Sequence, residues 1–276
     1  MKKTYSLGFL ICFLAFHFAF AQDFHELTEP VVAEGKLLYK SEMASWQGTD
    51  LFMAKFQNKS RAGGYLSYSE SGKNICIFYS NDEIPLVIAS FEFQDDFDPN
   101  RVEIDFKDRN FTEKEAKLYR LRLKTFETVS SSPDFFKSYQ NTKYNIIPLS
   151  DENGNRVYIL TGPSVSGVMI IGNDYLLEFD KNENLISKKS IHQNIIPIEF
   201  DKEQGNPVSI HSHLSQTGEL MSPTDICTLM LYGPYTGWGS HWVMSDKFVS
   251  IWDIEKEELF VMTREAFDKV VEDKEE

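Results

Sequence analysis

Hydrophobic and polar residues alternate along several segments of the first half of the chain, which is the pattern of half-buried β-strands. The predicted strands are residues 64–68, 74–79, 85–93 and 101–108. The first two flank Glu70-Ser71-Gly72-Lys73, whose composition is typical of a hairpin turn. The high content of aromatic residues, 22 Phe and 12 Tyr, also favours a β-rich core.

One helix is predicted in this half, over residues 112–128. Thr112 and Glu115 are spaced as a capping box, and Leu118, Leu121 and Phe126 are the expected buried stripe. A Ser- and Pro-rich break at residues 130–134 then predicts a boundary. Residues 22–133 are therefore predicted to form a β-rich N-terminal domain, to which the sequence assigns no role.

The second half mixes strand and helix patterns. Strands are expected at residues 156–161, 168–180, 185–200, 207–213 and 242–253, with a turn at Gly205-Asn206. The segment 168–180 reads either as one long strand or as a hairpin through Gly172-Asn173. An apolar helix is expected over residues 226–232, after Ser222-Pro223-Thr224-Asp225, and an amphipathic helix over residues 263–271. Residues 134–276 thus predict a domain of mixed sheet and flanking helices, and the whole chain is expected to be α+β.

The N-terminus has the three parts of a cleavable signal peptide, residues 1–21. Lys2 and Lys3 are followed by an apolar run over residues 7–20, and Ala19-Phe20-Ala21 matches the small-x-small cleavage pattern. The run is shorter than the roughly 20 residues that span a bilayer, so no integral membrane segment is expected after cleavage. The protein is predicted to be secreted or to lie in the periplasm or cell envelope. An uncleaved N-terminal anchor is the alternative.

Charge excludes one class of partner. Without Lys2 and Lys3, 26 basic side chains face 42 acidic ones, a net charge of −16. Such a surface repels phosphate backbones, so no nucleic acid is expected as a partner.

Two cysteines follow the signal peptide, Cys76 and Cys227. Each sits in an apolar stretch, which favours buried thiols over a disulfide.

Candidate chemistry is concentrated at residues 211–225. In a strand, His211 and His213 point to the same face, where both imidazoles can reach one metal ion. Asp225 follows in the first turn of the predicted helix. Two imidazoles and a carboxylate, with water in the fourth position, make an open zinc site of the catalytic kind. Ser222 and Asp225 are explained equally well as a capping box, but that explanation leaves the two histidines unaccounted for.

These residues resemble the metallopeptidase motif of the JAMM (MPN-domain) family. That motif reads His-x-His-Pro, a short loop and then Ser-x-x-Asp at the start of a helix, and here it is matched by His211, His213, Ser222 and Asp225. The resemblance implies a cytidine-deaminase-like α/β core with a β-rich region before it. It also implies zinc held by His211, His213 and Asp225, and a Ser222 that stabilises the tetrahedral intermediate.

The sequence departs from the family pattern in three ways. Leu214 replaces the usual Pro, and eleven rather than ten residues separate His213 from Asp225. The general-base Glu that the family carries upstream has only approximate candidates, Glu178 and Glu199, of which Glu178 is taken as the base.

The expected function is an exported zinc-dependent hydrolase, peptidase or isopeptidase-like, acting on a peptide or protein. Two alternatives stay open: a non-catalytic envelope protein that binds a partner on a degenerate JAMM-like fold, and a protein whose zinc is purely structural. His192 is a possible further ligand, or a partner of a ligand, if its strand neighbours residues 210–213; otherwise it is a half-exposed strand histidine. The glycine- and aromatic-rich segment before His241 either lines a substrate groove or forms a packed turn.

Overall fold

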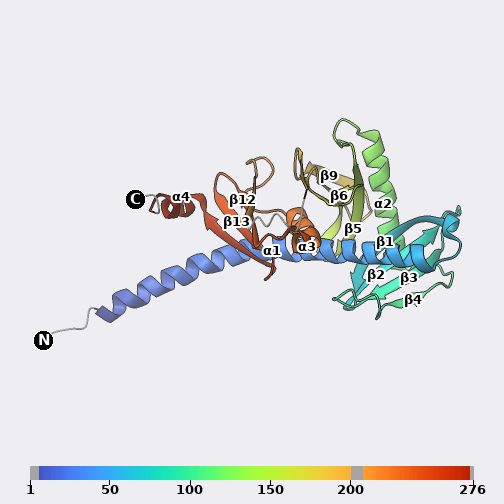
Figure 1. Cartoon of the computed structure of the whole chain (residues 1–276), viewed down its shortest axis with the longest axis horizontal. Coiled ribbons are helices and arrows are strands. Elements are labelled where there is room, and N and C mark those ends of the chain that lie inside the picture. Colours follow the sequence, from blue (N-terminus) through green and yellow to red (C-terminus); the bar gives the residue numbers. More distant parts are fainter. Residues whose placement is uncertain (1–5, 200–207, 274–276) are drawn as a thin grey trace.

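The computed structural model of the chain describes residues 6–199 and 208–273, and the side chains from residue 24 onward. It is an α+β structure of several small sheets held along one long helix, as the sequence predicts at that level (Figure 1). The predicted turn at Gly205-Asn206 lies outside the described residues. Of the predicted signal peptide, only the backbone of residues 6–21 is described, as the beginning of the long helix.

The first sheet matches most of the predicted strands. It runs in the order β1 (Ala62–Glu70), β2 (Lys73–Ser80), β3 (Val87–Phe93) and β4 (Glu103–Asp105), all antiparallel. Ser71 and Gly72 take φ values of 51° and 76° in the turn between the first two strands, as a primed two-residue turn requires. The predicted strand 101–108 shrinks to three residues.

The predicted helix is α2 (Glu113–Ser131), and it begins with the expected capping box at Thr112 and Glu115. Leu118 and Leu121 are buried, but Phe126 is 46% exposed. Thr125, one position earlier on the helix, takes the buried place instead, and its hydroxyl donates to the carbonyl of Leu121. The predicted stripe is therefore wrong at its last position.

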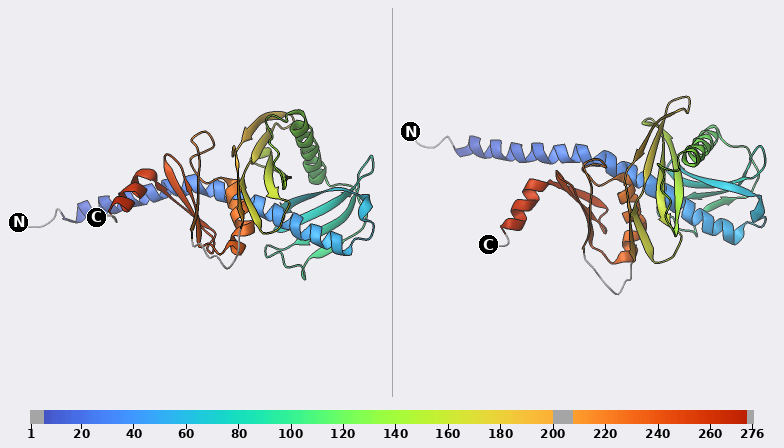
Figure 2. Two further views of the ribbon diagram at one scale, coloured as in Figure 1. Left: turned by 45° about the horizontal axis from the view of Figure 1, so that its top comes forward. Right: turned by 90° about the horizontal axis from the view of Figure 1, so that it is seen from above.

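A second long helix was not predicted. α1 (Ser6–Lys55) crosses the whole molecule and contacts the first sheet, β5, β14 and α3 (Figures 1 and 2). Its buried stripe recurs at intervals of three and four residues but consists largely of small residues: Gly35, Leu38, Ser41, Ala44, Ser45, Gly48 and Phe52. Such a stripe carries little hydrophobic signal. The glycines are needed for close approach, since a Cβ on Gly35 would lie 2.7 Å from the Ile226 side chain.

The second sheet has the antiparallel order β5 (Thr142–Asp151), β6 (Gly154–Pro163), β8 (Tyr175–Phe179) and β9 (Leu185–Ser190). Neither reading of residues 168–180 is right, because β7 (Val168–Gly172) leaves this sheet to pair with β10 (Ile195–Glu199). The predicted strand 185–200 is likewise split into β9 and β10. The break between them contains His192.

The C-terminal sheet carries the candidate site. Its order is β11 (Val208–Ser212), β12 (Ser240–Met244), β13 (Phe248–Asp253) and β14 (Glu258–Thr263). β11 and β12 are parallel and the remaining pairs antiparallel, so the sheet is mixed. α3 (Pro223–Thr236) connects the parallel strands and packs on α1, and α4 (Arg264–Glu272) follows the last strand. The predicted strand 242–253 is in fact the β12–β13 hairpin.

Two other expectations concern the described residues. Cys76 and Cys227 are both buried thiols, as predicted. Among the residues that the structure describes, no helix has the length and apolar character needed to cross a bilayer.

Candidate metal centre

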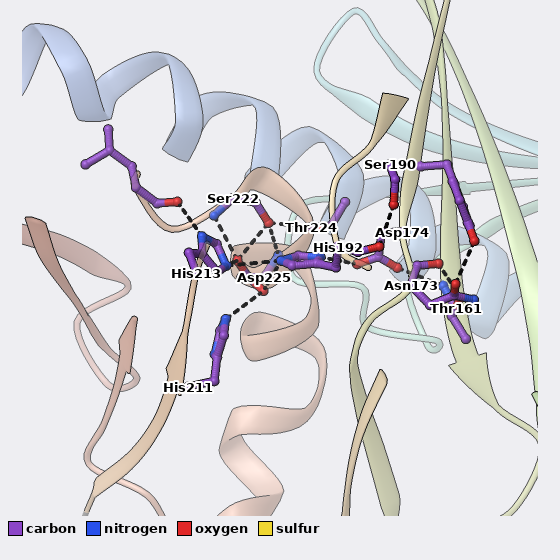
Figure 3. A network of polar contacts seen from close by, with 12 residues as sticks. Thr161, Asn173, Asp174, Ser190, His192, His211, His213, Ser222, Thr224 and Asp225 are labelled. Atoms are coloured by element: carbon purple, nitrogen blue, oxygen red, sulfur yellow. Dashed lines mark hydrogen bonds and ion pairs between the residues drawn. The ribbon is translucent and has the colours of Figure 1, made fainter. Parts of the chain in front are cut away.

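His211 and His213 lie at the end of β11. The strand pairs with β12 through His211 opposite Val243, and the backbone N–H of His213 still donates to the carbonyl of Met244 at 2.9 Å. Because alternate residues of a strand share a face, both rings point the same way, toward the start of α3 (Figure 3). Their ring centroids are 4.9 Å apart.

Asp225 faces the two rings from the first turn of α3. Ser222 is the N-cap residue and Pro223 follows at the first helical position, as the sequence predicts. The backbone N–H of Ser222 donates to Asp225 Oδ2 at 2.8 Å, and the backbone N–H of Asp225 donates to Ser222 Oγ at 3.1 Å. The capping box therefore fixes the Asp225 carboxylate at the helix end and turns it toward β11.

His192 approaches from the opposite side. It lies between β9 and β10, at the point where the chain crosses from the second sheet to β7. Its Nδ1 is 3.3 Å from Asp174 Oδ2, and Asp174 is itself held by the backbone N–H of Thr161, which donates to Oδ1 at 2.9 Å. His192 Nε2 is thereby pointed at Asp225 (Figure 3).

These four side chains form one compact group. One ligand atom from each of His192, His211, His213 and Asp225 lies within 4.8 Å of all the others, and all four residues are buried. The distances from His192 Nε2 are 3.1 Å to His213 Nε2 and 3.4 Å to Asp225 Oδ1. Asp225 lies 3.7 Å from His211 Nε2 through Oδ1 and 3.3 Å from His213 Nε2 through Oδ2. The cluster could hold a metal ion.

The outer ring nitrogens are all occupied by protein partners. Besides the Asp174 contact of His192, His213 Nδ1 is 2.9 Å from the carbonyl of Leu220 and His211 Nδ1 is 2.7 Å from His241 Nε2. Each Nδ1 is therefore engaged and each Nε2 faces the centre, the arrangement that metal-binding histidines normally show. Among the described residues, His211 Nε2 and Asp225 Oδ1 are buried without a hydrogen-bond partner.

Burial and the neighbouring charges shift the pKa values of the clustered residues in opposite directions. Burial by itself would raise the pKa of Asp225, but the facing His192 holds it well below its usual range. Burial would lower the pKa of His192, yet the facing Asp225 and Asp174 raise it to about 10. Burial lowers the pKa of His211 to about 4. Without a metal, the site is thus an ion pair of His192 and Asp225 beside a neutral His211.

The structure brings together only some of the predicted site residues. His211, His213 and Asp225 meet, and Ser222 adjoins them, its hydroxyl donating to Asp225 Oδ2 at 2.7 Å. Glu178 does not join the group. It lies in β8, and its exposed carboxylate accepts a hydrogen bond from the Ser187 hydroxyl. Glu199 is exposed at the end of β10.

Two residues beside the cluster, Asp174 and His241, were not predicted from the sequence to belong to the site. Asp174 follows β7 with no motif around it. His241 is not close in sequence to any of the four clustered residues. It is nevertheless buried in β12 beside His211, and its Nδ1 lies 2.5 Å from Ser209 Oγ. The first half of the segment before it is the last turn of α3, which ends at Thr236, and a short turn from Gly237 leads to β12; Tyr235 of this segment lines a groove, but that groove is not beside the four clustered residues. A histidine inside an apolar strand was the one available signal.

Comparison of this chain with protein-family models, with curated proteins and with solved structures finds no match in any of the three. The candidate site therefore has to be interpreted from its own geometry.

Proposed function

We propose that this protein binds zinc through His192, His211, His213 and Asp225. Tetrahedral zinc with ligand distances of about 2.0–2.1 Å places neighbouring ligand atoms about 3.3 Å apart. Four of the six distances between ligand atoms, 3.1 to 3.7 Å, lie around this value, and all the ligand atoms lie within 4.8 Å of one another. Three imidazoles and one carboxylate are also a donor set that zinc accepts.

The observation that carries the proposal is that two buried atoms have no hydrogen-bond partner: His211 Nε2, and Asp225 Oδ1, which has only ion-pair contacts such as that with His192 Nε2 at 3.4 Å. Leaving such atoms without a partner costs about 1–3 kcal/mol each, and folded proteins rarely tolerate it. Both atoms face the centre of the cluster. A cation there would satisfy both at once and offset the negative charge of Asp225.

Four protein ligands make a closed site, which is the structural rather than the catalytic type. The ligands come from the break before β10, from the end of β11 and from the start of α3. The first segment follows β9 of the second sheet, whereas the other two belong to the C-terminal sheet and to the helix α3 that connects its parallel strands. We therefore propose that the ion fixes the C-terminal sheet and α3 against the second sheet, and that the protein has a zinc-stabilised binding or structural role.

Metal content tests this proposal directly. The protein purified without chelator should contain about one equivalent of zinc, and His213→Ala should contain well under 0.2 equivalents. His25→Ala is the control, because His25 is an exposed histidine of α1. Wild-type protein that neither contains zinc nor takes it up would refute the proposal.

A zinc-dependent hydrolase on a JAMM-like core is the second candidate, and it rests on the Asp174–His192 pair. If His192 is not a ligand, then His211, His213 and Asp225 are the three ligands of the resembled motif. His192 Nε2 would then hold a proton beside them, oriented through Nδ1 by Asp174, as a substitute for the missing glutamate. The zinc would supply a polarised carbonyl and a more acidic bound water. The substrate would be a peptide or protein outside the cytosol, if the N-terminal segment directs export.

His192→Ala distinguishes the two candidates. If the site is closed, the variant loses a ligand and its zinc affinity falls. The wild-type protein then shows no zinc-dependent cleavage of peptide or isopeptide substrates. In a hydrolase, the variant keeps about one zinc but loses about 10²-fold or more in rate. Zinc titration and a peptide-library cleavage assay on the same two preparations give both readouts.

A further inference from the structure

A second site lies near the other end of α3. A groove with a volume of about 660 Å³ opens between α1, the paired strands β5 and β6, and the end of α3. These elements adjoin one another in Figures 1 and 2. The volume is within the range of small-molecule sites, about 300–1,000 Å³. The groove is separate from the metal centre, since none of the four ligand residues lines it.

One face of α1 provides the first wall. Glu42, Trp46 and Asp50 are spaced four residues apart and therefore lie one above another along the helix. Trp46 is 43% exposed and packs at a tilt against Tyr232 of α3, with ring centroids 6.3 Å apart. Tyr65 of β1 also lines the groove. The wall thus combines carboxylates with aromatic rings.

Glu42 is the polar group at the base of this wall. It is half-buried, and Asn145 Nδ2 donates to its Oε2 at 3.0 Å. Among the described residues, Glu42 forms no salt bridge with a Lys, Arg or His side chain. Lys143 and Arg122 lie nearby, but Arg122 Nη1 donates to the carbonyl of Ile146. Burial raises the pKa of Glu42 to about 7, consistent with a carboxylate that has no cation paired to it.

We propose that the groove binds a protonated amine of a small organic ligand, with the ammonium group between the Glu42 carboxylate and the ring of Trp46. Carboxylate oxygens accept hydrogen bonds from an ammonium, and the face of an indole ring is the best aromatic partner for a cation. Asp50 adds a second negative charge at the same wall, and Lys143 is the cation among the lining residues. The net charge of −14 also attracts cations to the surface.

Calorimetric titration with spermidine tests this proposal, at pH 8 so that Glu42 is ionised. Wild-type protein should bind spermidine, and Glu42→Gln should weaken the affinity about tenfold or more, because the charge-assisted contact is lost. Trp46→Leu should weaken it by several-fold, whereas Trp46→Phe keeps an aromatic face and most of the affinity. Glu26→Gln, which makes the same change on an exposed part of α1, should leave the affinity unchanged.

Three results would overturn the proposal. These are no binding of spermidine at millimolar concentration, equal affinity in wild type and Glu42→Gln, and binding of the neutral sugar maltose in place of spermidine. Thermal unfolding of each variant checks that its fold is intact. Glu42→Gln removes a buried charge, so it is expected to fold at least as well as wild type, which keeps the comparison interpretable.

Discussion

The proposed zinc site at His192, His211, His213 and Asp225 is tested most sharply by comparing the stability of the protein with and without zinc. A ligand that binds only the folded state stabilises it by about 4 kcal/mol when present at about 1,000 times its dissociation constant. The four ligand residues are buried and come together only on folding, so the unfolded chain has no equivalent site. For a chain of this size, 1 kcal/mol shifts the melting temperature by about 2–4 °C, so zinc should raise it by about 8–16 °C.

The assay is thermal unfolding of chelator-treated protein with and without added zinc. His213→Ala serves as the test variant, because the substitution removes a ligand and also leaves the Leu220 carbonyl without its 2.9 Å partner. Its melting temperature should be lower than that of wild type and should respond little to zinc. His25→Ala should respond as wild type does. If the wild-type transition is the same with zinc and with chelator, the cluster is a buried ion pair of His192 and Asp225, and the metal proposal fails.

Three further predictions concern the fold. Gly35→Ala should lower the free energy of unfolding by about 1–3 kcal/mol, measured in urea, because the new Cβ would lie 2.7 Å from the Ile226 side chain. Arg156→Met should cost about 3–5 kcal/mol in the same assay, since it removes the guanidinium that pairs through two nitrogens with Glu34 of α1. The pKa of Glu42 is raised to about 7 in the folded protein, so its contribution to stability is present at low pH and is lost as pH rises through 7. Urea unfolding between pH 5 and 8 should show Glu42→Gln gaining stability relative to wild type as pH rises.

Each of these predictions has a matched control. Lys36→Ala changes the neighbouring helix position without the close approach and should be nearly neutral. Arg120→Met removes an exposed ion pair with Glu183 and should cost less than about 1 kcal/mol. Glu26→Gln should show no pH-dependent gain. Variants at Gly35 and Arg156 that unfold like these controls, or a Glu42→Gln profile parallel to wild type, would contradict the packing and burial described above.

Local patterns in the sequence predicted much of what is local in the structure. The β1–β2 turn follows from Ser71 and Gly72, and the starts of α2 and α3 follow from their capping boxes. Cap and turn geometry depends on side chains within a few residues, so the sequence carries it directly. The pairing of His211 with His213 on one face is of the same kind, because strand periodicity alone places them there.

Features that depend on contacts between distant parts of the chain could not be predicted from local patterns. The stripe of α1 is made of small residues whose burial depends on what packs against them, as Gly35 does against Ile226. A helix that is buried through close backbone approach has few large apolar side chains, so hydrophobic periodicity does not predict it. The signal that could have found it is the three- and four-residue spacing of Gly, Ser and Ala, which is meaningful only beside a partner surface.

The candidate site shows the same division. His211, His213 and Asp225 could be proposed from spacing, since each position is set by a strand or a helix cap. His192 is placed by the crossing of the chain from β9 to β10 and Asp174 by the crossing from β7 to β8, and both crossings depend on β10 pairing with β7. Strand pairing between distant segments is decided by tertiary packing, so the sequence could name His192 only as a possible ligand, and the folded structure places it beside the other three residues. With His192 included, the site that we propose is a closed one, whereas the sequence predicts an open, catalytic zinc site.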